Sequence, residues 1–152
     1  MADNHFWTQI AHNRIFLITL VVWFLAQTVK VVIGFFQEKR FNFRWFIGTG
    51  GMPSSHAAGA SALATCVGLD QGFDTTLFAV AASFALVTMF DAQGVRRATG
   101  QQATILNKMM EDIYWKGQIE NKRLKELVGH TPVQVIAGLF FGVFCAALLF
   151  PS

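Results

Sequence analysis

The stretch Gly50-Gly51-Met52-Pro53-Ser54-Ser55-His56 is the part of the sequence around which the rest is arranged. Two glycines allow a tight turn, and Pro53 suits the first turn of a helix, where its missing N–H is not needed. Ser54 and Ser55 can cap that helix, which would hold His56 in its first turn. Free N–H groups and partial positive charge make a helix N-terminus a binding site for phosphate, and a histidine there can transfer protons near neutral pH. The simpler alternative is a capped helix whose histidine lies at a membrane interface.

Composition indicates a membrane protein with a single domain. The chain has 152 residues, of which 53% are hydrophobic and only 14% charged, and this is too apolar for an ordinary soluble domain. Sixteen phenylalanines against one tyrosine point to helices that face lipid. Cys66 and Cys145 both lie in apolar runs, which favours small core residues over a disulfide or a metal site. We therefore expect an all-α integral membrane helical bundle that comprises residues 1–152.

Apolar runs predict four transmembrane helices, at about 15–36, 54–69, 75–90 and 133–150. The second run is short and rich in glycine and alanine, which indicates burial among the other helices rather than in lipid. We interpret residues 1–14 as an interfacial leader and residues 91–130 as a cytoplasmic segment of amphipathic helices. In the last span, Gly138 and Gly142 have the Gly-x-x-x-Gly spacing of closely packed helices.

The distribution of Lys and Arg predicts the orientation of these spans. The 37–49 loop holds three such residues, the 69–74 turn none, and the 91–130 segment seven. By the positive-inside rule the first and third of these segments are cytoplasmic, and both termini lie outside. The candidate phosphate-binding groups then share the cytoplasmic face; they are Arg40, Arg44, Ser54, Ser55, His56, Arg96, Arg97 and His130.

Two further features belong to this face. Lys30 is the only charged residue in the first span; it is either a lysine that snorkels to the headgroups or, as we favour, part of a polar site. Gly129-His130-Thr131-Pro132 repeats the pattern of the first turn, with Thr131 as a helix cap and Pro132 as the first helical residue. A second histidine is therefore expected at a helix N-terminus.

Together these motifs resemble the divergent branch of the type 2 phosphatidic acid phosphatase family, which is also described as related to acid phosphatases and vanadium-dependent haloperoxidases. The resemblance extends from about Lys30 onward and rests on four segments, Arg40-Phe41-Asn42-Phe43-Arg44, Gly50 to His56, Asp91-Ala92-Gln93-Gly94-Val95-Arg96-Arg97 and Gly129-His130-Thr131-Pro132. It implies an α-helical, metal-independent phosphatase that works through a phosphohistidine, without a cofactor. The haloperoxidases of the superfamily are soluble, which makes vanadate-dependent oxidation the weaker alternative for this apolar chain.

The resemblance implies that groups from two parts of the chain bind the phosphate. Lys30 and one of Arg40 or Arg44 would contact phosphate oxygens, since an arginine fork suits two such oxygens at once. Ser54 and Ser55, with their backbone N–H groups, would hold another oxygen. Dense positive charge and positioning are what phosphoryl transfer needs most.

Catalysis would depend on two histidines and an arginine. The resemblance implies that His130 is the nucleophile and that His56 protonates the leaving alcohol. Arg96 or Arg97 would clamp the charge that develops on the equatorial oxygens. One histidine must be neutral to attack while the other is protonated to donate, so a pair of histidines is required.

The sequence departs from the pattern of the superfamily at four places. Ser55 stands where the superfamily has glycine, no Arg-Pro follows the lysine of the first span, and the third motif is interrupted by more than thirty residues before His130. Gln134 stands four residues after His130, where the superfamily has aspartate. At this helical spacing its amide can accept a hydrogen bond from the imidazole and orient it, but it cannot neutralise an imidazolium. Asp91 or Glu126 is an alternative orienting carboxylate.

We therefore expect a membrane phosphatase that hydrolyses a phosphomonoester or diphosphate of a lipid, either a phospholipid or an isoprenyl phosphate. The expected location is the inner or plasma membrane, with the site facing the cytoplasm. The alternative is a phospholipid-binding or scaffolding membrane protein that keeps the phosphate pocket without turnover. Membrane lipids and a second copy of the chain are the expected partners, the latter because small-residue faces favour helix association. Nucleic acid is not expected as a partner.

Overall fold

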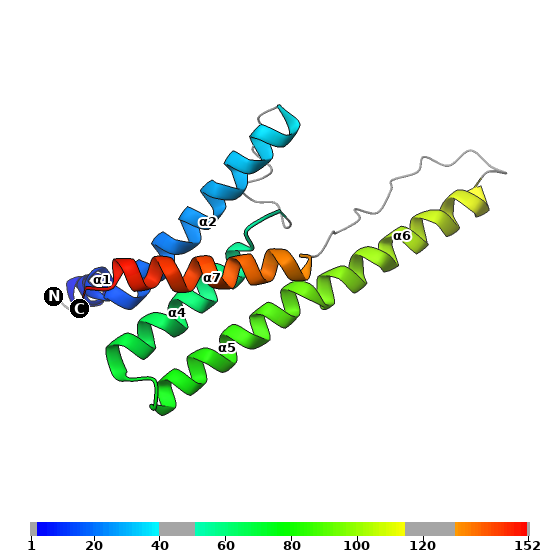
Figure 1. Ribbon diagram of the computed structural model, residues 1–152. Coiled ribbons are helices and arrows are strands. Elements are labelled where there is room, and N and C mark those ends of the chain that lie inside the picture. The colour runs from blue at the N-terminus through cyan, green and yellow to red at the C-terminus, as the bar shows by residue number, and fades with distance from the viewer. Residues whose placement is uncertain (1–2, 40–50, 115–129, 152) are drawn as a thin grey trace.

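A computed structural model of the chain describes residues 3–39, 51–114 and 130–151 (Figure 1). These parts contain helices and no strand, so the expectation of an all-α protein is confirmed for them. The helices are α1 (Asp3–His12), α2 (Arg14–Glu38), α4 (Ser55–Gln71), α5 (Thr76–Gln93), α6 (Val95–Tyr114) and α7 (Pro132–Leu149).

Three of these helices are long and apolar enough to cross a membrane, namely α2 over Arg14–Phe36, α5 and α7. The fourth expected span corresponds to α4, which has 17 residues and is not among the three. At 1.5 Å per residue, α4 is about 25 Å long, shorter than the roughly 30 Å hydrocarbon core of a bilayer. Four transmembrane helices are therefore not confirmed, although α4 is the helix that the others surround.

The central position of α4 follows from its small side chains. Helices α2, α5 and α7 each pack against α4, and most of its Ala, Gly and Ser residues are buried. Two glycines of α7 let its backbone reach that of α4: a Cβ on Gly138 would collide with the Ser54 carbonyl, and one on Gly142 with the Ala58 carbonyl. The prediction of close packing from the Gly-x-x-x-Gly spacing is thus confirmed.

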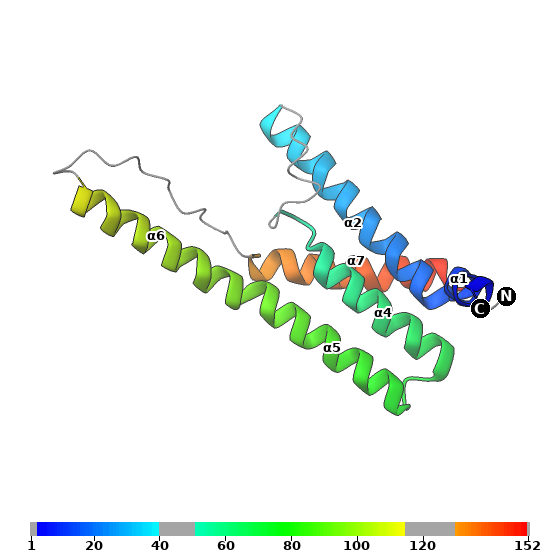
Figure 2. The ribbon, with the colours of Figure 1, turned by 180° about the vertical axis from the view of Figure 1, so that it is seen from behind.

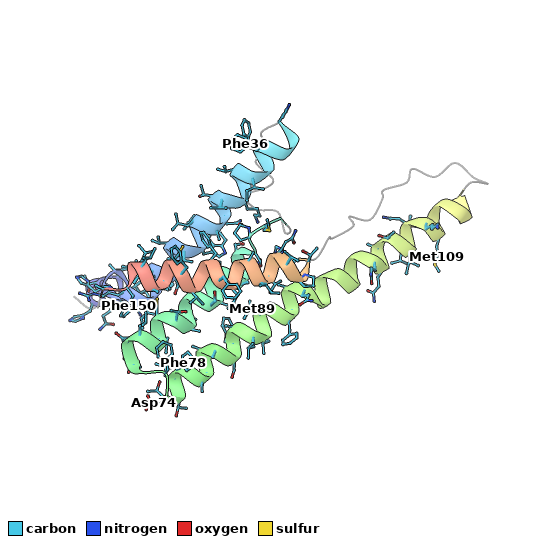
Figure 3. All side chains as sticks on the ribbon, in the orientation of Figure 1. Phe36, Asp74, Phe78, Met89, Met109 and Phe150 are labelled. Atoms are coloured by element: carbon cyan, nitrogen blue, oxygen red, sulfur yellow. The ribbon has the colours of Figure 1, made fainter. Side chains whose placement is uncertain are left out.

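The outer surface of the bundle is apolar. Large hydrophobic side chains of α5 and α7 are exposed, and these are Leu77, Val80, Phe84, Val87, Phe90, Val133, Ile136, Phe140, Phe144 and Leu148. An exposed apolar surface of this extent suits contact with lipid chains rather than with water. Figure 3 shows side chains projecting outward along both helices.

The ends of the helices divide the bundle into two poles. Helices α2 and α5 end, and α4 and α7 begin, toward the same pole (Figures 1 and 2). The opposite pole carries α1, the C-terminal end of α7 and the α4–α5 turn, where Asp74 lies (Figure 3). From the first pole, α6 continues almost in line with α5 and projects beyond the bundle, with Ile105, Leu106 and Met109 exposed. The remainder of the predicted 91–130 segment lies outside the described residues.

Candidate functional site

The first component of the site is the N-terminus of α4. Ser54 is the N-cap, and its side chain accepts a hydrogen bond from the Ala57 N–H at 3.3 Å. Both Ser54 and Ser55 are almost fully buried, and His56 follows in the first helical turn, half-buried. Gly51, with φ of 86°, provides the left-handed turn before the helix that the sequence predicted for a glycine. Ser54 is therefore the cap that we expected, but Pro53 precedes this cap instead of lying in the first helical turn, and Ser55 is the first helical residue.

The second component is the N-terminus of α7, which is built in the same way. Thr131 is the N-cap, Pro132 is the first helical residue, and Thr131 and Gln134 form a capping box. The Gln134 N–H donates to Thr131 Oγ1 at 3.4 Å, and the Thr131 N–H donates to Gln134 Oε1 at 3.0 Å. His130 precedes the cap and is 1% exposed, so its ring is enclosed by the protein.

Backbone hydrogen bonds fix these two helix starts relative to each other and to α5. The Ser54 N–H donates to the carbonyl oxygen of Gln134 at 3.0 Å, which joins the start of α4 to the first turn of α7. The His130 N–H donates to the carbonyl oxygen of Ala92 at 3.1 Å, which joins the residue before α7 to the end of α5. Three helices therefore hold the position of His130.

The two histidines meet at this junction although 74 positions separate them along the chain. The centroids of the His56 and His130 rings are 6.2 Å apart, and the ring planes are inclined by 59°. This separation is short enough for one tetrahedral anion to contact both rings. The sequence placed both residues at helix N-termini, and the fold brings those termini together.

Hydrogen bonding to Gln134 determines which nitrogen of His130 carries the proton. His130 Nδ1 lies 3.2 Å from Gln134 Oε1. That amide atom must be the oxygen, because it also accepts the Thr131 backbone N–H. Nδ1 is then the protonated nitrogen of a neutral His130 ring, and Nε2 carries the lone pair. This is the tautomer that a nucleophilic histidine requires.

Lys30 reaches the same junction from α2. Its side chain is 7% exposed, and a Cβ built on Gly51 would lie 2.9 Å from its Cγ and Cδ. The lysine stem therefore runs directly beside the turn that precedes α4. Of the two interpretations of Lys30, burial next to the turn favours a polar site over a side chain that snorkels to the headgroups.

The electrostatics of the junction favour an anion. Helices α4 and α7 both point their N-termini at it, and each N-terminus carries a partial positive charge. The cationic side chain of Lys30 adds to the same field. Because the junction lies in a largely apolar protein, these charges are less screened than they would be in water. A phosphate group is the kind of ligand that such a site binds.

The remaining predicted site residues lie on other elements or outside the described residues. Arg96 and Arg97 belong to the first turn of α6, which follows α5 directly. Asp91 is exposed, and the contact with His130 is made by Gln134. Arg40 and Arg44 lie outside the described residues, as does Glu126.

Two features of the junction were not predicted. Gln27 is 4% exposed, although it lies inside an apolar span, three residues before Lys30. It is the only amide between positions 15 and 36, and its i, i+3 spacing to Lys30 could have indicated a shared face. The role of the Ala92 carbonyl in holding His130 is a backbone contact, and a sequence carries no signal for it.

Comparison with known proteins agrees with this arrangement. A family model described as "Divergent PAP2 family" matches residues 11–145. The membrane protein YuiD of Bacillus subtilis (strain 168), described as uncharacterized, is 40% identical over 152 residues, which cover 93% of this chain and 96% of YuiD. No solved structure matches the chain.

Proposed function

The chain belongs to the divergent PAP2 family of membrane proteins, and from this premise we propose that it is a metal-independent phosphatase acting on a lipid phosphate. The observation that carries the proposal is the 6.2 Å separation of the His56 and His130 rings at a junction of two helix N-termini. The substrate is a phosphomonoester or diphosphate of a lipid. Its chains remain in the bilayer while the headgroup enters the junction.

In the proposed reaction, His130 is the nucleophile and His56 the general acid. Nε2 of His130 attacks phosphorus, and the bond from phosphorus to the leaving oxygen breaks. Protonated His56 gives its proton to that oxygen, which leaves as an alcohol or, from a diphosphate, as a phosphate. Neutral His56 then takes a proton from a water molecule that attacks the phosphohistidine, which releases inorganic phosphate and restores both histidines.

Charge stabilisation is divided between several parts of the chain. Lys30 and the N–H group of Ser55 bind two of the phosphate oxygens. The Ser54 N–H, which the resemblance also assigned to the phosphate, already donates to the carbonyl oxygen of Gln134. Arg96 or Arg97, and Arg40 or Arg44, supply the guanidinium groups that phosphoryl transfer requires. Gln134 holds the reactive tautomer of His130, as its distance to Nδ1 allows.

We further propose that α4 acts as a fourth transmembrane helix and that the junction faces the cytoplasm. The Lys and Arg residues of the 37–49 and 91–130 segments support this orientation through the positive-inside rule. A site at the cytoplasmic surface of the inner or plasma membrane would reach lipid phosphates of that leaflet, either phospholipids or isoprenyl phosphates.

Release of inorganic phosphate tests the proposal. Purified wild-type chain, His130→Ala and His56→Ala are compared in detergent on phosphatidate, phosphatidylglycerol phosphate and an isoprenyl diphosphate. We expect release by the wild type, and losses of at least a thousandfold in both variants. Equal and negligible release from all three proteins on all three lipids would contradict an enzymatic role.

A second function is favoured by one specific observation, the amide of Gln134 beside His130. A carboxylate at this place would stabilise an imidazolium, and loss of such a carboxylate can cost orders of magnitude in rate. A protein with this amide would still bind phosphate, and would serve as a phospholipid-binding or scaffolding protein without turnover. Binding of inorganic phosphate without phosphate release, together with a large gain of activity in Gln134→Asp, would favour this second function.

A further inference from the structure

The helices that pack around α4 leave one of its sides open. Helix α7 lies next to both α2 and α5, but the backbones of α2 and α5 are not adjacent anywhere in the described residues. Figure 2 shows α4 in front with α2 and α5 on either side of it, whereas α7 lies behind. We call this side of α4 the α2–α5 opening. Because α2 and α5 are both long and apolar enough to span a membrane, the opening between them faces the bilayer.

Contacts of α4 define the two edges of the α2–α5 opening. Gly59 faces α2, since a Cβ built on it would lie 3.4 Å from the Trp23 ring. Ala60 faces α5, because it belongs to a cluster with Ala81 and Ala85. The opening lies between these two directions.

His56 and Leu63 occupy the open side of α4. Leu63 follows the residues that face α2 and α5 by about one turn and lies between their faces. His56 precedes Leu63 by seven positions, or two turns, and therefore shares its face. Within residues 55–68 every residue is buried except His56, Leu63 and Thr65, and Thr65 lies on the opposite side of the helix from Leu63. The pattern of burial thus agrees with an opening between α2 and α5.

The proposed reaction gives this open side a function. His56 donates its proton to the leaving oxygen, and that oxygen carries the lipid part of the substrate. The lipid chain must therefore start beside His56 and continue into the bilayer. The open side of α4 runs from His56 to Leu63 over about 10 Å. The opposite side of α4 is closed, since the backbone of α7 lies against the carbonyl groups of Ser54 and Ala58.

We propose that the α2–α5 opening binds the hydrocarbon chain of the substrate, with Leu63 in contact with the chain, and that the lipid enters the site sideways through it. This inference rests on the lipid-phosphate site of the proposed function. Apolar contact along the chain supplies binding energy remote from phosphorus, and this energy positions the phosphate between the two histidines. A substrate without a chain is therefore expected to react with a much lower kcat/KM.

Photolabelling of the wild-type protein locates the lipid chain directly. The probe is a phosphatidate with a diazirine in the middle of one acyl chain, and mass spectrometry identifies the labelled residues. We expect label at Leu63 and on the neighbouring parts of α2 and α5, and we expect excess unlabelled phosphatidate to displace it. Label that is confined to the outward sides of α5 and α7, or that excess phosphatidate does not reduce, would overturn the inference.

A variant tests whether turnover uses the same surface. Leu63→Trp fills the open side without changing a phosphate-binding group. We expect its kcat/KM for dioleoyl phosphatidate to fall about tenfold, while that for glycerol 3-phosphate, which has no acyl chain, stays within about twofold of the wild type. Leu148→Trp is the matched control, because it makes the same substitution at an exposed position of α7, on the other side of α4. It should keep the wild-type values for both substrates.

An unchanged kcat/KM for dioleoyl phosphatidate in Leu63→Trp, or an equal fall for both substrates, would overturn the inference while leaving the phosphatase intact. If the wild type hydrolyses neither substrate, the phosphatase proposal fails. In that case, or if Leu63→Trp does not fold, the photolabelling of the wild type decides. Displaceable label at Leu63 would support a chain-binding surface in the α2–α5 opening, and its absence would overturn it.

Discussion

At the scale of single residues, Gln134 joins the fold of α7 to the chemistry of the site. One amide oxygen accepts the Thr131 N–H, which completes the capping box, and also contacts His130 Nδ1. The carbonyl oxygen of the same residue accepts the Ser54 N–H from α4. The capping box holds the Gln134 side chain in one position at the start of α7. Because the same amide oxygen contacts His130 Nδ1, the capping box also orients the His130 ring.

Substitutions of Gln134 should separate its two roles. Gln134→Glu keeps the side-chain length and the capping box and adds a charge that stabilises an imidazolium, so we expect kcat to rise about tenfold. Gln134→Leu loses both contacts, and should cost about 1 kcal/mol of stability and more than tenfold in kcat. Steady-state kinetics and thermal unfolding in detergent measure both effects. A lower kcat in Gln134→Glu than in the wild type would contradict the role given to the amide.

Gly51 links the turn before α4 to Lys30. Its φ of 86° disfavours any side chain, and a Cβ would press on the Lys30 stem at 2.9 Å. Gly51→Ala should therefore destabilise the protein by about 1–2 kcal/mol and displace the lysine from the phosphate. We expect a severalfold weaker affinity for inorganic phosphate, measured by calorimetry. A phosphate affinity equal to that of the wild type would show that Lys30 does not bind the anion.

At the scale of helices, the packing of α7 on α4 sets the separation of the two histidines. The helices run in the same direction, and Gly138 and Gly142 let the α7 backbone approach the α4 carbonyls. Ser61 reinforces this contact, since its hydroxyl lies within hydrogen-bond distance of the carbonyl oxygens of Ala58 and Leu139. A larger distance between α4 and α7 would move their N-termini apart. It would also break the hydrogen bond from the Ser54 N–H to the Gln134 carbonyl oxygen.

Substitution of either glycine should therefore affect stability and binding together. Gly138→Ala and Gly142→Ala introduce a methyl group where backbone already lies, and each should cost about 1–3 kcal/mol. Gly138→Ala, which collides with the Ser54 carbonyl, should also weaken phosphate binding. Ala147→Val adds volume on the exposed face of the same helix and serves as the control. A Gly138→Ala variant as stable as this control would mean that α7 and α4 are not packed so closely.

The helices themselves were largely predictable, and their distances were not. Caps at Ser54 and Thr131, the proline at the start of α7 and the apolar spans follow from local rules of helix formation. Pairing of His56 with His130 was expected only through the family resemblance. Their actual separation depends on glycine contacts and backbone hydrogen bonds between helices, which no local pattern specifies. Gln27 was overlooked because one amide barely changes the hydropathy of a span.

At the scale of the whole molecule, polar function is concentrated at one pole of the bundle. Both histidines and Lys30 lie by the starts of α4 and α7. These helix starts are at one pole, whereas α1 and the α4–α5 turn with Asp74 are at the other (Figures 1 and 3). The apolar sides of α5 and α7 between the poles match a bilayer. Under the proposed function, this division would let a lipid substrate keep its chains in the bilayer while its phosphate enters the junction.

Cysteine labelling tests which pole faces the cytoplasm. In a background with Cys66→Ala and Cys145→Ala, single variants Asp74→Cys and Asp91→Cys place exposed thiols at the start and end of α5. We expect a membrane-impermeant maleimide to label Asp74→Cys in intact cells, and Asp91→Cys only after permeabilisation. The reverse pattern would place the site outside and would contradict the orientation derived from Lys and Arg.

The most direct test of the central claim is an experimental structure of the wild-type chain with bound orthovanadate, an analogue of the phosphoryl group in the transition state of transfer. We predict density for the anion between the rings of His56 and His130, in contact with Nε2 of His130 and close to the Lys30 ammonium and the start of α4. Vanadate bound elsewhere, or rings too far apart to contact one anion, would contradict the claim that the two helix N-termini form a phosphate site.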